Sequence, residues 1–156
     1  MISLIWAMDE SNLIGANNKM PWHVKEDLIY FKNITKNHIV VMGYNTYLSM
    51  LGYYKDKPFP YKKTYVLTHK DLTDDRVCVV HDKESILKLE DDIFIVGGKS
   101  LYMLFINDAK YLYISYIKGV HTGDTYIDFL DLNDFDLIKE NITEQVRYTV
   151  YERKKN

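Results

Sequence analysis

Residues 93–118 read IFIVGGKSLYMLFINDAKYLYISYIK, and the order of the elements they predict indicates the fold. The apolar run 93–96 predicts a strand that ends at Gly97-Gly98, residues 100–107 are expected to form a helix, and residues 109–118 predict a second strand. A strand, a helix and another strand in succession are typical of a parallel sheet covered by helices. Ligands of such sheets bind beyond the carboxyl ends of the strands, so we expect a site at the edge where the glycine pair lies.

The same alternation extends over the rest of the chain. It predicts strands at residues 2–7, 38–42, 63–68, 77–80, 135–142 and 145–153, and helices at residues 24–35, 45–51 and 83–89. The last two strands follow each other directly and are expected to form an antiparallel pair at one edge. The prediction is an α/β fold in which residues 1–156 form a single domain. It would contain a mostly parallel twisted sheet of about eight strands, an antiparallel C-terminal edge and about four flanking helices.

The composition is that of a soluble globular protein. The chain has 156 residues, of which 47% are hydrophobic and 27% charged, and its formal net charge of −2 argues against the basic face of a nucleic-acid-binding protein. The N-terminus has no signal-peptide pattern, and no apolar run approaches the roughly 20 residues of a membrane helix. Cys78 is the only cysteine, so no internal disulfide can form. We therefore expect a cytoplasmic protein with neither nucleic acid nor membrane as a partner.

Asp27 points most directly to chemistry. It precedes Leu28 by one position and Phe31 by four, so a helix over 24–35 places its carboxylate beside the apolar stripe. Burial there would raise the pKa of the carboxyl group and suit it to hold or relay a proton near neutral pH. The helix dipole alone also favours an aspartate in the first turn, and without further context that silent role is the commoner one.

The segment before this helix supplies context. Met20-Pro21-Trp22 introduces the helix, and Trp22 could cover the mouth of a pocket. Upstream, the polar segment 9–19 contains Ile14-Gly15, and the glycine gives it the freedom expected of a lid over the strand ends. A polar segment of this kind could equally be a solvated connection.

Two glycine-bearing turns connect strands to helices. Gly97-Gly98 would let the backbone approach a ligand closely, and Gly43 precedes Asn45 and Thr46, either of which can cap the next helix. Each turn alone is more often a tight turn or a simple cap than a cofactor site. Two of them at one edge of a sheet nevertheless suggest a ligand with two phosphates.

Polar side chains also follow the strand 63–68. Thr68-His69-Lys70 could hold a terminal phosphate, although a solvated turn is the default interpretation. The five histidines are scattered and lack the spacing of metal ligands, so no metal site is expected.

These motifs together resemble the dihydrofolate reductase family over nearly the whole chain. The most specific feature is Pro21-Trp22 followed five residues later by Asp27, with Gly97-Gly98 much further along. The other matching segments are 4–7, Ile14-Gly15, Leu28 with Tyr30-Phe31, 41–43, Thr46-Tyr47 with Ser49, 66–69 and Gly123-Asp124-Thr125. The resemblance implies an NADPH-dependent oxidoreductase that reduces dihydrofolate to tetrahydrofolate, feeds one-carbon metabolism and thymidylate synthesis, and is inhibited by antifolates.

The resemblance also implies roles for individual residues. Asp27 would be the catalytic acid that hydrogen-bonds the pterin, with Ser115 supporting it and Trp22 beside it. The residues that line the pterin and benzoyl pocket or bind the substrate would be Ile5, Trp6, Ala7, Asp27, Leu28, Phe31, Ser49, Phe59, Lys62, Val96, Tyr102 and Ser115. The cofactor-binding residues would be Ala7, Ile14, Gly15, Met20, Gly43, Tyr44, Asn45, Thr46, Leu67, Thr68, His69, Lys70, Val96, Gly97, Gly98, Lys99, Ser100, Leu101, Tyr102 and Thr125. Segment 9–24 would be the lid over the nicotinamide, Gly97-Gly98 would form the family's cis peptide, and the enzyme is expected to be a monomer.

The chain departs from the family pattern at several positions. Tyr44 stands where the family usually has an arginine for the cofactor's 2′-phosphate, which leaves the preference for NADPH over NADH open. Lys62 replaces the arginine that holds the folate glutamate carboxylate, and an ammonium cannot form the bidentate pair of a guanidinium. If the register shifts by one residue in the long segment 51–57, Lys63 takes that position. Lys99 replaces a third glycine, which a helical position would tolerate.

Two other functions fit the same architecture. A pyrimidine reductase of riboflavin biosynthesis shares the fold and the cofactor but is not expected to have Pro21-Trp22 together with Asp27. A non-catalytic nucleotide-binding relative would be expected to lack Asp27 or the glycines, and this chain has both.

Overall fold

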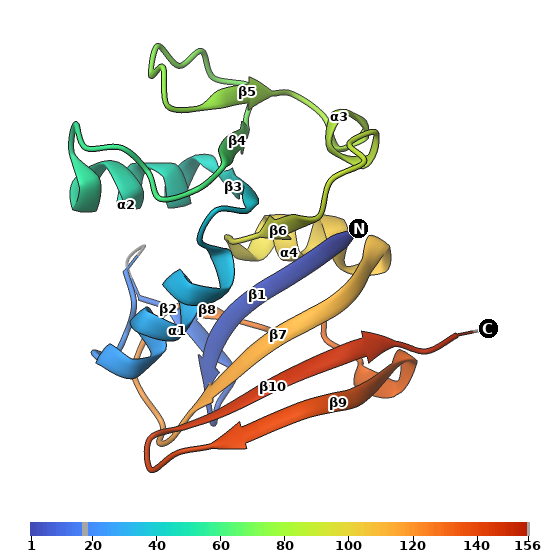
Figure 1. Ribbon diagram of the computed structural model, residues 1–156. Helices are drawn as coiled ribbons and strands as arrows, with labels where there is room; N and C mark the ends of the chain where they lie inside the picture. Colours follow the sequence, from blue (N-terminus) through green and yellow to red (C-terminus); the bar gives the residue numbers. More distant parts are fainter. Residues whose placement is uncertain (17–18, 156) are drawn as a thin grey trace.

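The computed structural model describes residues 1–16 and 19–155, in which an eight-stranded sheet has helices on both faces (Figure 1). The strand order is β5-β4-β3-β6-β1-β7-β10-β9. The strands are β1 Ile2–Asp9, β3 Ile39–Gly43, β4 Lys63–Leu67, β5 Cys78–Val80, β6 Ile93–Ile95, β7 Ala109–Ile117, β9 Phe135–Ile142 and β10 Val146–Arg153. The pairs from β5 to β7 are parallel, whereas β10 pairs antiparallel with both β7 and β9. The predicted fold class is confirmed, including the antiparallel C-terminal edge.

Four helices and a two-stranded sheet complete the described part of the chain. The helices are α1 Lys25–Thr35, α2 Tyr44–Tyr54, α3 Lys83–Leu87 and α4 Lys99–Phe105, with 3₁₀ turns at Ile106–Asp108 and Leu132–Asp134. The small sheet pairs β2, Leu13–Gly15, with β8, Thr125–Tyr126. These two strands were not predicted, because elements of two or three residues are too short to show an alternating pattern.

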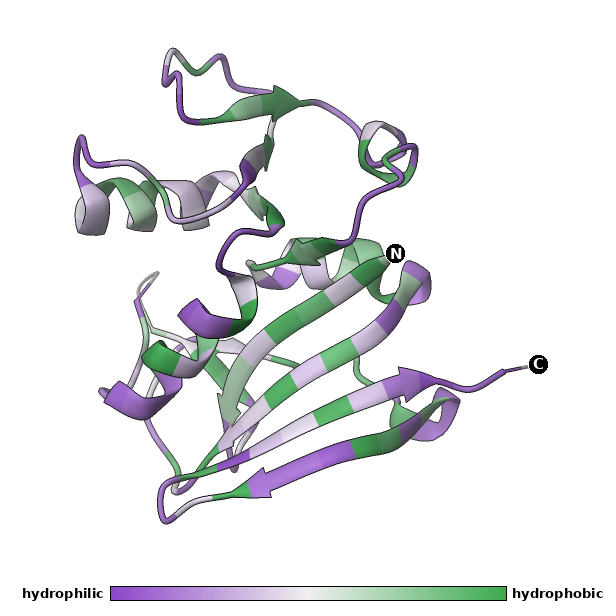
Figure 2. Ribbon diagram, viewed as in Figure 1, coloured by the Kyte–Doolittle hydropathy of each residue, from purple (hydrophilic) through white to green (hydrophobic). Residues whose placement is uncertain are grey.

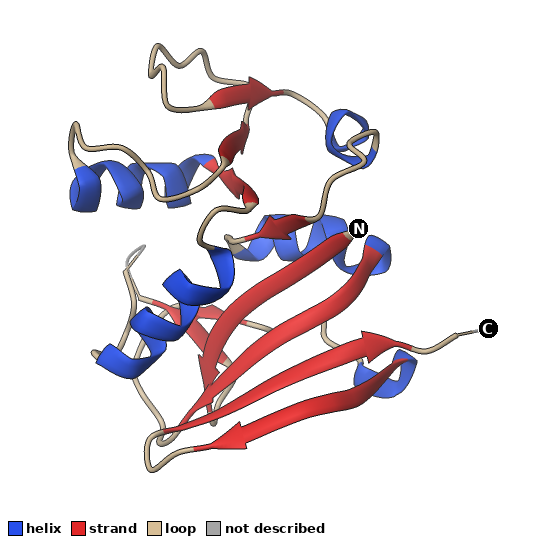
Figure 3. Cartoon of the chain, in the orientation of Figure 1, coloured by secondary structure: helices blue, strands red, loops and turns tan. Residues whose placement is uncertain are grey.

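Alternating side chains along β1 divide the core between the two faces of the main sheet. Leu4 and Trp6 pack on the side of α4, whereas Ile5 packs on the side of α1 and α2 (Figure 3). Seven of the eight residues of β1 are buried, as expected of a strand covered on both faces. By contrast, only Phe135 of the edge strand β9 is buried, and Figure 2 shows a hydrophilic stretch in the half of this strand next to its arrowhead. This alternation directs Ile5 toward α1, the helix that contains Asp27.

The predicted helices differ from the observed ones at their ends. Helix α1 begins at Lys25 with Val24 as its N-cap, and α2 continues through Gly52 to Tyr54. Helix α4 begins one residue earlier than predicted and gives way to a 3₁₀ turn after Phe105. No helix in residues 1–16 and 19–155 is long and apolar enough to cross a membrane.

Candidate active site

Asp27 lies in the first turn of α1, where its N–H donates to the carbonyl of Val24 at 3.1 Å. Only 5% of this residue is exposed. Burial raises the pKa of the carboxyl group to about 6, the hydrogen bond with the Ser115 hydroxyl lowers it, and the charge of Glu26 raises it. An acid with this pKa is partly protonated near neutral pH and can either donate or accept a proton. The burial that the spacing predicted is present, and the catalytic role stays a prediction.

A small cavity connects Asp27 with the end of β1. It measures about 20 Å³ and is lined by Ile5, Trp6, Ala7, Asp27, Tyr30, Phe31 and Ser115. The register of β1 and β7 sets Ser115 directly opposite Ala7. This volume holds about one water molecule, so the side chains close around the carboxyl group in this conformation. Except for Tyr30, every lining residue is among those predicted to bind the substrate.

Glu26 is held differently from its neighbour Asp27. Its Oε1 accepts hydrogen bonds from the Thr143 hydroxyl at 2.6 Å and from the Tyr148 hydroxyl at 3.0 Å. The Tyr148 ring also packs against Tyr30, with ring centroids 4.3 Å apart. The two adjacent acids of α1 therefore have different surroundings. Glu26 is hydrogen-bonded to Thr143 and Tyr148, whereas Asp27 lines the cavity.

The other predicted substrate residues differ in how closely they adjoin the cavity. Phe59 and Val96 pack in the same apolar cluster as Ile5 and Phe31. Leu28 is 48% exposed on the outer side of α1. On the opposite face of the sheet, the Tyr102 hydroxyl donates to the carbonyl of Ile5 at 2.7 Å. Ser49 remains within α2, where its hydroxyl donates to the carbonyl of Asn45 at 3.2 Å.

Lys63 is the first residue of β4, and Lys62 precedes it. The Lys62 ammonium is 3.9 Å from Oδ1 of Asp91, and its side chain is 64% exposed. The Lys63 ammonium lies 5.0 Å from the ring centroid of Tyr65. Both lysines are therefore accessible cations, and the choice between them for the substrate carboxylate stays a prediction.

The two glycine turns meet at one point. The N–H of Gly43 donates to the carbonyl of Gly97 at 2.8 Å, and the peptide bond between Gly97 and Gly98 is cis, as the resemblance implied. Gly97 has a φ of +135°, and a Cβ atom there would lie 3.0 Å from the Thr46 hydroxyl. A Cβ atom on Gly98 would meet its nearest neighbour, the same hydroxyl, at 3.9 Å. Gly97 is thus the position of the pair that least tolerates a side chain.

The predicted phosphate cluster includes a histidine that the sequence analysis missed. The Lys70 ammonium lies 4.8 Å from the ring centroid of Tyr44. The rings of His69 and His81 stack with centroids 6.3 Å apart, and Nδ1 of His81 is 2.7 Å from the carbonyl oxygen of Thr68. His81 follows β5, the neighbouring strand, and nothing in its local sequence links it with residues 68–70.

Lys99 begins α4, so the position of the family's third glycine is helical here, as expected. Its ammonium pairs with Oδ1 of Asp128 at 3.0 Å. The hydrogen bond from Lys99 lowers the pKa of Asp128.

Hydrogen bonds to the Asp9 carboxylate connect the beginning of the predicted lid with the loop after β7. This carboxylate is fully buried and accepts hydrogen bonds from the N–H groups of Ser11 at 2.8 Å and Leu13 at 3.0 Å. The N–H of His121 donates to it at 2.6 Å. Burial by itself raises the pKa of Asp9, but the hydrogen bonds from Ser11, His121 and Leu13 outweigh it and lower the pKa to about 2.

The remaining lid residues pair with the loop that leads to β8. Gly15 pairs with Thr125, and its carbonyl accepts a hydrogen bond from the N–H of Asp124 at 3.0 Å. Met20 is 45% exposed. Residues 17–18 of the predicted lid lie outside the described residues.

Trp22 is buried, and its ring meets that of His121 edge-on at 5.4 Å. Its indole Nε1 is a buried donor that has no hydrogen-bond partner among the residues that the structure describes. A larger depression of about 570 Å³ beside it is lined by Pro21, Trp22, His23, Val24, Ile117, Lys118, His121, Glu144 and Gln145. The smaller cavity at Asp27 is the better candidate for chemistry, because it contains the buried acid. Among the described residues, no group of His, Cys, Asp and Glu side chains could hold a metal ion.

Comparison with known proteins gives one consistent family. The family model described as dihydrofolate reductase matches residues 1–154. The dihydrofolate reductase of Ureaplasma parvum is 33% identical over 159 residues, covering 99% of this chain and 99% of the relative. That of Bacillus subtilis is 34% identical over 142 residues, covering 88% of this chain and 82% of the relative. A solved structure of dihydrofolate reductase from Enterococcus faecalis, complexed with NADP(H) and RAB-propyl, has a TM-score of 0.86 and 29% identity, covering 99% of this chain and 97% of that one. This chain belongs to the dihydrofolate reductase family.

Proposed function

We propose that this protein reduces dihydrofolate to tetrahydrofolate and that NADPH is the cofactor. The observation on which this rests is the buried carboxyl group of Asp27, which lines the cavity formed by α1, β1 and β7 and has a pKa raised to about 6. A reduction that adds hydride to carbon and a proton to the neighbouring nitrogen needs such a group near neutral pH.

The residues around the cavity would bind and orient the pterin. Asp27 would accept hydrogen bonds from the ring's amino and nitrogen groups and promote protonation beside the carbon that receives hydride. Ser115 would keep the carboxyl group in place through its hydroxyl. The indole N–H of Trp22, which has no partner in residues 1–16 and 19–155, would donate to a polar atom of the ligand or to an ordered water. Ile5 and Phe31 would exclude bulk water from the reacting atoms.

The glycine turns fit a dinucleotide. The two turns meet where the N–H of Gly43 donates to the carbonyl of Gly97, and a pyrophosphate would bind beside this point. Thr46, Lys99, Ser100 and Leu101 would surround it. When bound, NADPH supplies the hydride, and the chain's task is to place it and exclude water.

At the other end of the cofactor, Lys70, Thr68 and the paired rings of His69 and His81 would receive the 2′-phosphate in place of the missing arginine. Leu67 and Tyr44 would border the adenosine. The segment formed by Ile14, Gly15 and Met20, with Thr125 behind it, would close over the nicotinamide.

We further propose that the enzyme acts as a single-domain cytoplasmic monomer, that its product feeds one-carbon metabolism and thymidylate synthesis, and that antifolates inhibit it. No feature of the described site favours a pyrimidine reductase of riboflavin biosynthesis or a non-catalytic relative, because Asp27 and both glycine turns are in place.

The decisive experiment follows NADPH oxidation by absorbance with dihydrofolate present, absent, or replaced by the pyrimidine substrate of the riboflavin pathway. We expect oxidation only with dihydrofolate, with tetrahydrofolate as the product. Oxidation that depends on the pyrimidine, or no oxidation by a folded protein that binds NADPH, would contradict the proposal.

A further inference from the structure

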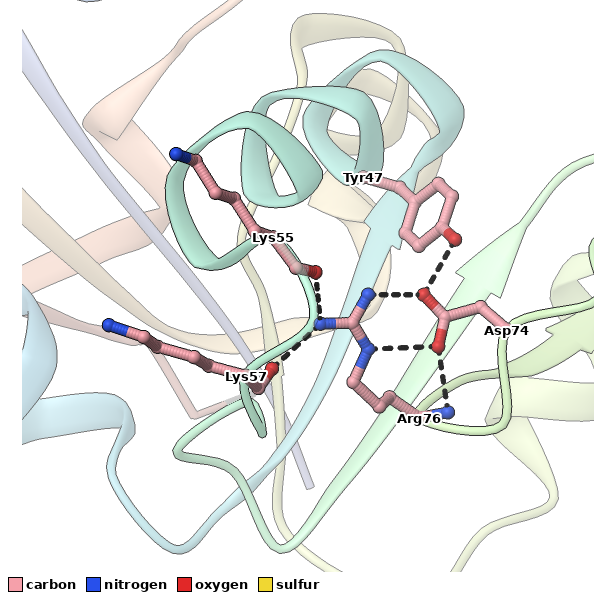
Figure 4. A network of polar contacts seen from close by, with 5 residues as sticks. All are labelled: Tyr47, Lys55, Lys57, Asp74 and Arg76. Carbon is pink, nitrogen blue, oxygen red and sulfur yellow. Dashed lines mark hydrogen bonds and ion pairs between the residues drawn. The ribbon is translucent and has the colours of Figure 1, made fainter.

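The guanidinium of Arg76 donates hydrogen bonds to the carboxylate of Asp74 and to two backbone carbonyls (Figure 4). Its Nε and Nη2 donate to the two carboxylate oxygens of Asp74 at 2.9 and 2.7 Å. Its Nη1 donates to the carbonyls of Lys55 and Lys57, both at 2.7 Å. The side chain of Arg76 is 21% exposed and that of Asp74 is 13% exposed, so the pair is largely shielded from water. A planar guanidinium is the only side chain that can make this set of bonds at once.

Asp74 is fixed from three directions. It accepts a third hydrogen bond from Arg76, through the backbone N–H at 2.9 Å, and one from the Tyr47 hydroxyl at 2.8 Å. The hydrogen bond from the Arg76 side chain, with those from the Arg76 backbone and Tyr47, lowers the pKa of Asp74 far below its usual range. The carboxylate therefore stays charged throughout the working range of pH, and the pair does not act as a proton switch.

The two carbonyls that Arg76 binds belong to the turn after α2. Lys55 caps this helix with a φ of +55°, and its N–H donates to the carbonyl of Leu51. The N–H of Lys57 donates to the carbonyl of Tyr54. Both carbonyls lie beyond Tyr54, the last residue of α2, and the guanidinium donates a hydrogen bond to each of them. Arg76 thus fixes the start of the segment that leads to Phe59.

Arg76 also contacts Phe59 itself. The guanidinium carbon lies 4.3 Å from the centroid of the Phe59 ring, and the ring of Tyr54 meets that of Phe59 edge-on at 5.6 Å. The Phe59 ring is therefore positioned by contacts with both Arg76 and Tyr54. It belongs to the apolar cluster of Ile5 and Phe31, both of which line the cavity at Asp27.

We propose that Arg76 is a positioning residue for the substrate: it holds the ring of Phe59 where the aromatic part of dihydrofolate, attached to the pterin, packs against it. This inference rests on the proposed function. Arg76 does not touch the reacting atoms. Its effect should therefore be confined to binding of the benzoylglutamate part and should not reach the chemistry at Asp27.

The test compares two substrates and uses a matched control. Arg76→Met keeps the length and apolar volume of the stem but removes the donors. Arg153 is the control, because its Nε and Nη2 also donate to two carbonyls, those of Ala109 and Ile106, and its guanidinium lies 4.5 Å from the ring of Phe135. Arg153→Met should lose comparable stability but leave both substrates unaffected, since this arginine lies between β7 and β9.

For Arg76→Met we expect the KM for dihydrofolate to rise about three- to ten-fold with kcat within about two-fold, because ground-state and transition-state binding weaken equally. The KM for a dihydropterin that lacks benzoylglutamate should not change. In a Phe59→Leu background, Arg76→Met should have little further effect, because two residues that act through one contact are not additive. Arg76→Lys keeps the charge without the planar fork and should resemble Arg76→Met.

Three results would overturn the inference: an unchanged KM for dihydrofolate, equal changes for both substrates, or full additivity with Phe59→Leu. If Arg76→Met does not fold, Arg76→Lys is measured against the same criteria. Failure of the proposed function is distinguishable, because the parent enzyme itself would then not oxidise NADPH with dihydrofolate.

Discussion

The chemistry of Asp27 depends on opposing effects on one carboxyl group. Burial of this α1 residue against β1 and β7 disfavours the charged form, whereas the hydrogen bond with Ser115 favours it. The balance leaves a pKa of about 6, at which both protonation states are populated near neutral pH. The spacing of Asp27 from Leu28 and Phe31 predicted the burial. The size of the pKa shift could not be predicted in this way, because it also depends on Ser115 of β7, which lies 88 positions after Asp27 in the sequence.

Replacing Asp27 tests this role directly. Asp27→Asn keeps the size of the side chain but cannot exchange a proton, so turnover at neutral pH should fall by on the order of 10²–10⁴. The inflection near pH 6 in the rate profile of the parent should disappear in the variant. The control is Glu26→Gln, because Glu26 is the adjacent acid and instead binds Thr143 and Tyr148. Equal losses in the two variants, or full activity of Asp27→Asn, would remove Asp27 from the mechanism.

Gly97 gives a second prediction for a single residue. An alanine would have to adopt a φ of +135° with its Cβ atom 3.0 Å from the Thr46 hydroxyl. Gly97→Ala should lower the free energy of unfolding by about 1–3 kcal/mol and weaken NADPH binding at least about ten-fold. Gly52→Ala is the control, since a Cβ atom there meets nothing within 4 Å. Urea unfolding measures the change in stability, and fluorescence titration with NADPH measures the change in affinity. If Gly97→Ala bound NADPH as tightly as the parent, the glycine pair would be an ordinary turn with no part in cofactor binding.

Among the elements, the small sheet of β2 and β8 shows what local sequence reasoning could not detect. Ile14-Gly15 was recognised as part of a lid, but its partner strand was not, because the pairing joins residues more than 100 positions apart. The same applies to Asp9, whose bonds to His121 span 112 positions. Within a few residues, Asp9 and Ser11 resemble an ordinary turn in which a side chain binds nearby N–H groups. The contacts that fix the lid are therefore tertiary.

Gly123 allows the pairing of β2 and β8 to be tested. A Cβ atom on Gly123 would lie 2.5 Å from the carbonyl oxygen of Gly15 and 2.7 Å from Cδ1 of Leu13. Gly123→Ala must therefore displace β2 or the 123–125 loop, and misplacement of the lid should reduce kcat by on the order of ten-fold. The main sheet should remain folded, because Gly123 lies outside it.

The measurements for Gly123→Ala are kcat, KM and the thermal midpoint, again beside Gly52→Ala. Gly52 lies within α2, so an alanine there should be neutral or slightly stabilising. If Gly123→Ala retained the parent's kcat, the β2–β8 pairing would have no part in turnover.

At the scale of the whole molecule, the sequence predicted those features that depend on the residue pattern within one element or on the order of neighbouring elements. Continuous apolar runs predicted the buried parallel strands, and the absence of a helix between the last two strands predicted the antiparallel edge. Arg76, Asp74 and His81 were missed because their roles come from side-chain contacts across loops. Arg76 binds carbonyls 19 and 21 positions earlier in the chain, and nothing in the composition of either segment indicates this.

Two buried acids affect the stability of the whole molecule in opposite directions as the pH changes. The pKa of Asp9 is lowered from 3.8 to about 2, so its contribution is present above pH 3.8 and is lost as the pH falls toward 2. The pKa of Asp27 is raised from 3.8 to about 6, so its contribution is fully present below pH 3.8 and is lost as the pH rises through 6. Above that range, folding has to bury a charged carboxylate at Asp27.

Asp27→Asn should therefore stabilise the protein at the pH where it inactivates the enzyme. The shift from 3.8 to about 6 is roughly two pH units, and at 1.36 kcal/mol per unit the charged carboxylate costs on the order of 3 kcal/mol above pH 7. Measured by urea unfolding, the difference between Asp27→Asn and the parent should be constant below about pH 4, grow in favour of the variant between about pH 4 and 6, and level off above pH 7. Glu26→Gln is the matched control, because Glu26 is the adjacent acid and instead accepts hydrogen bonds from Thr143 and Tyr148. A difference that does not change with pH would mean that Asp27 titrates in the folded protein as it does in the unfolded chain, and the proposed proton-holding role would then lose its physical basis.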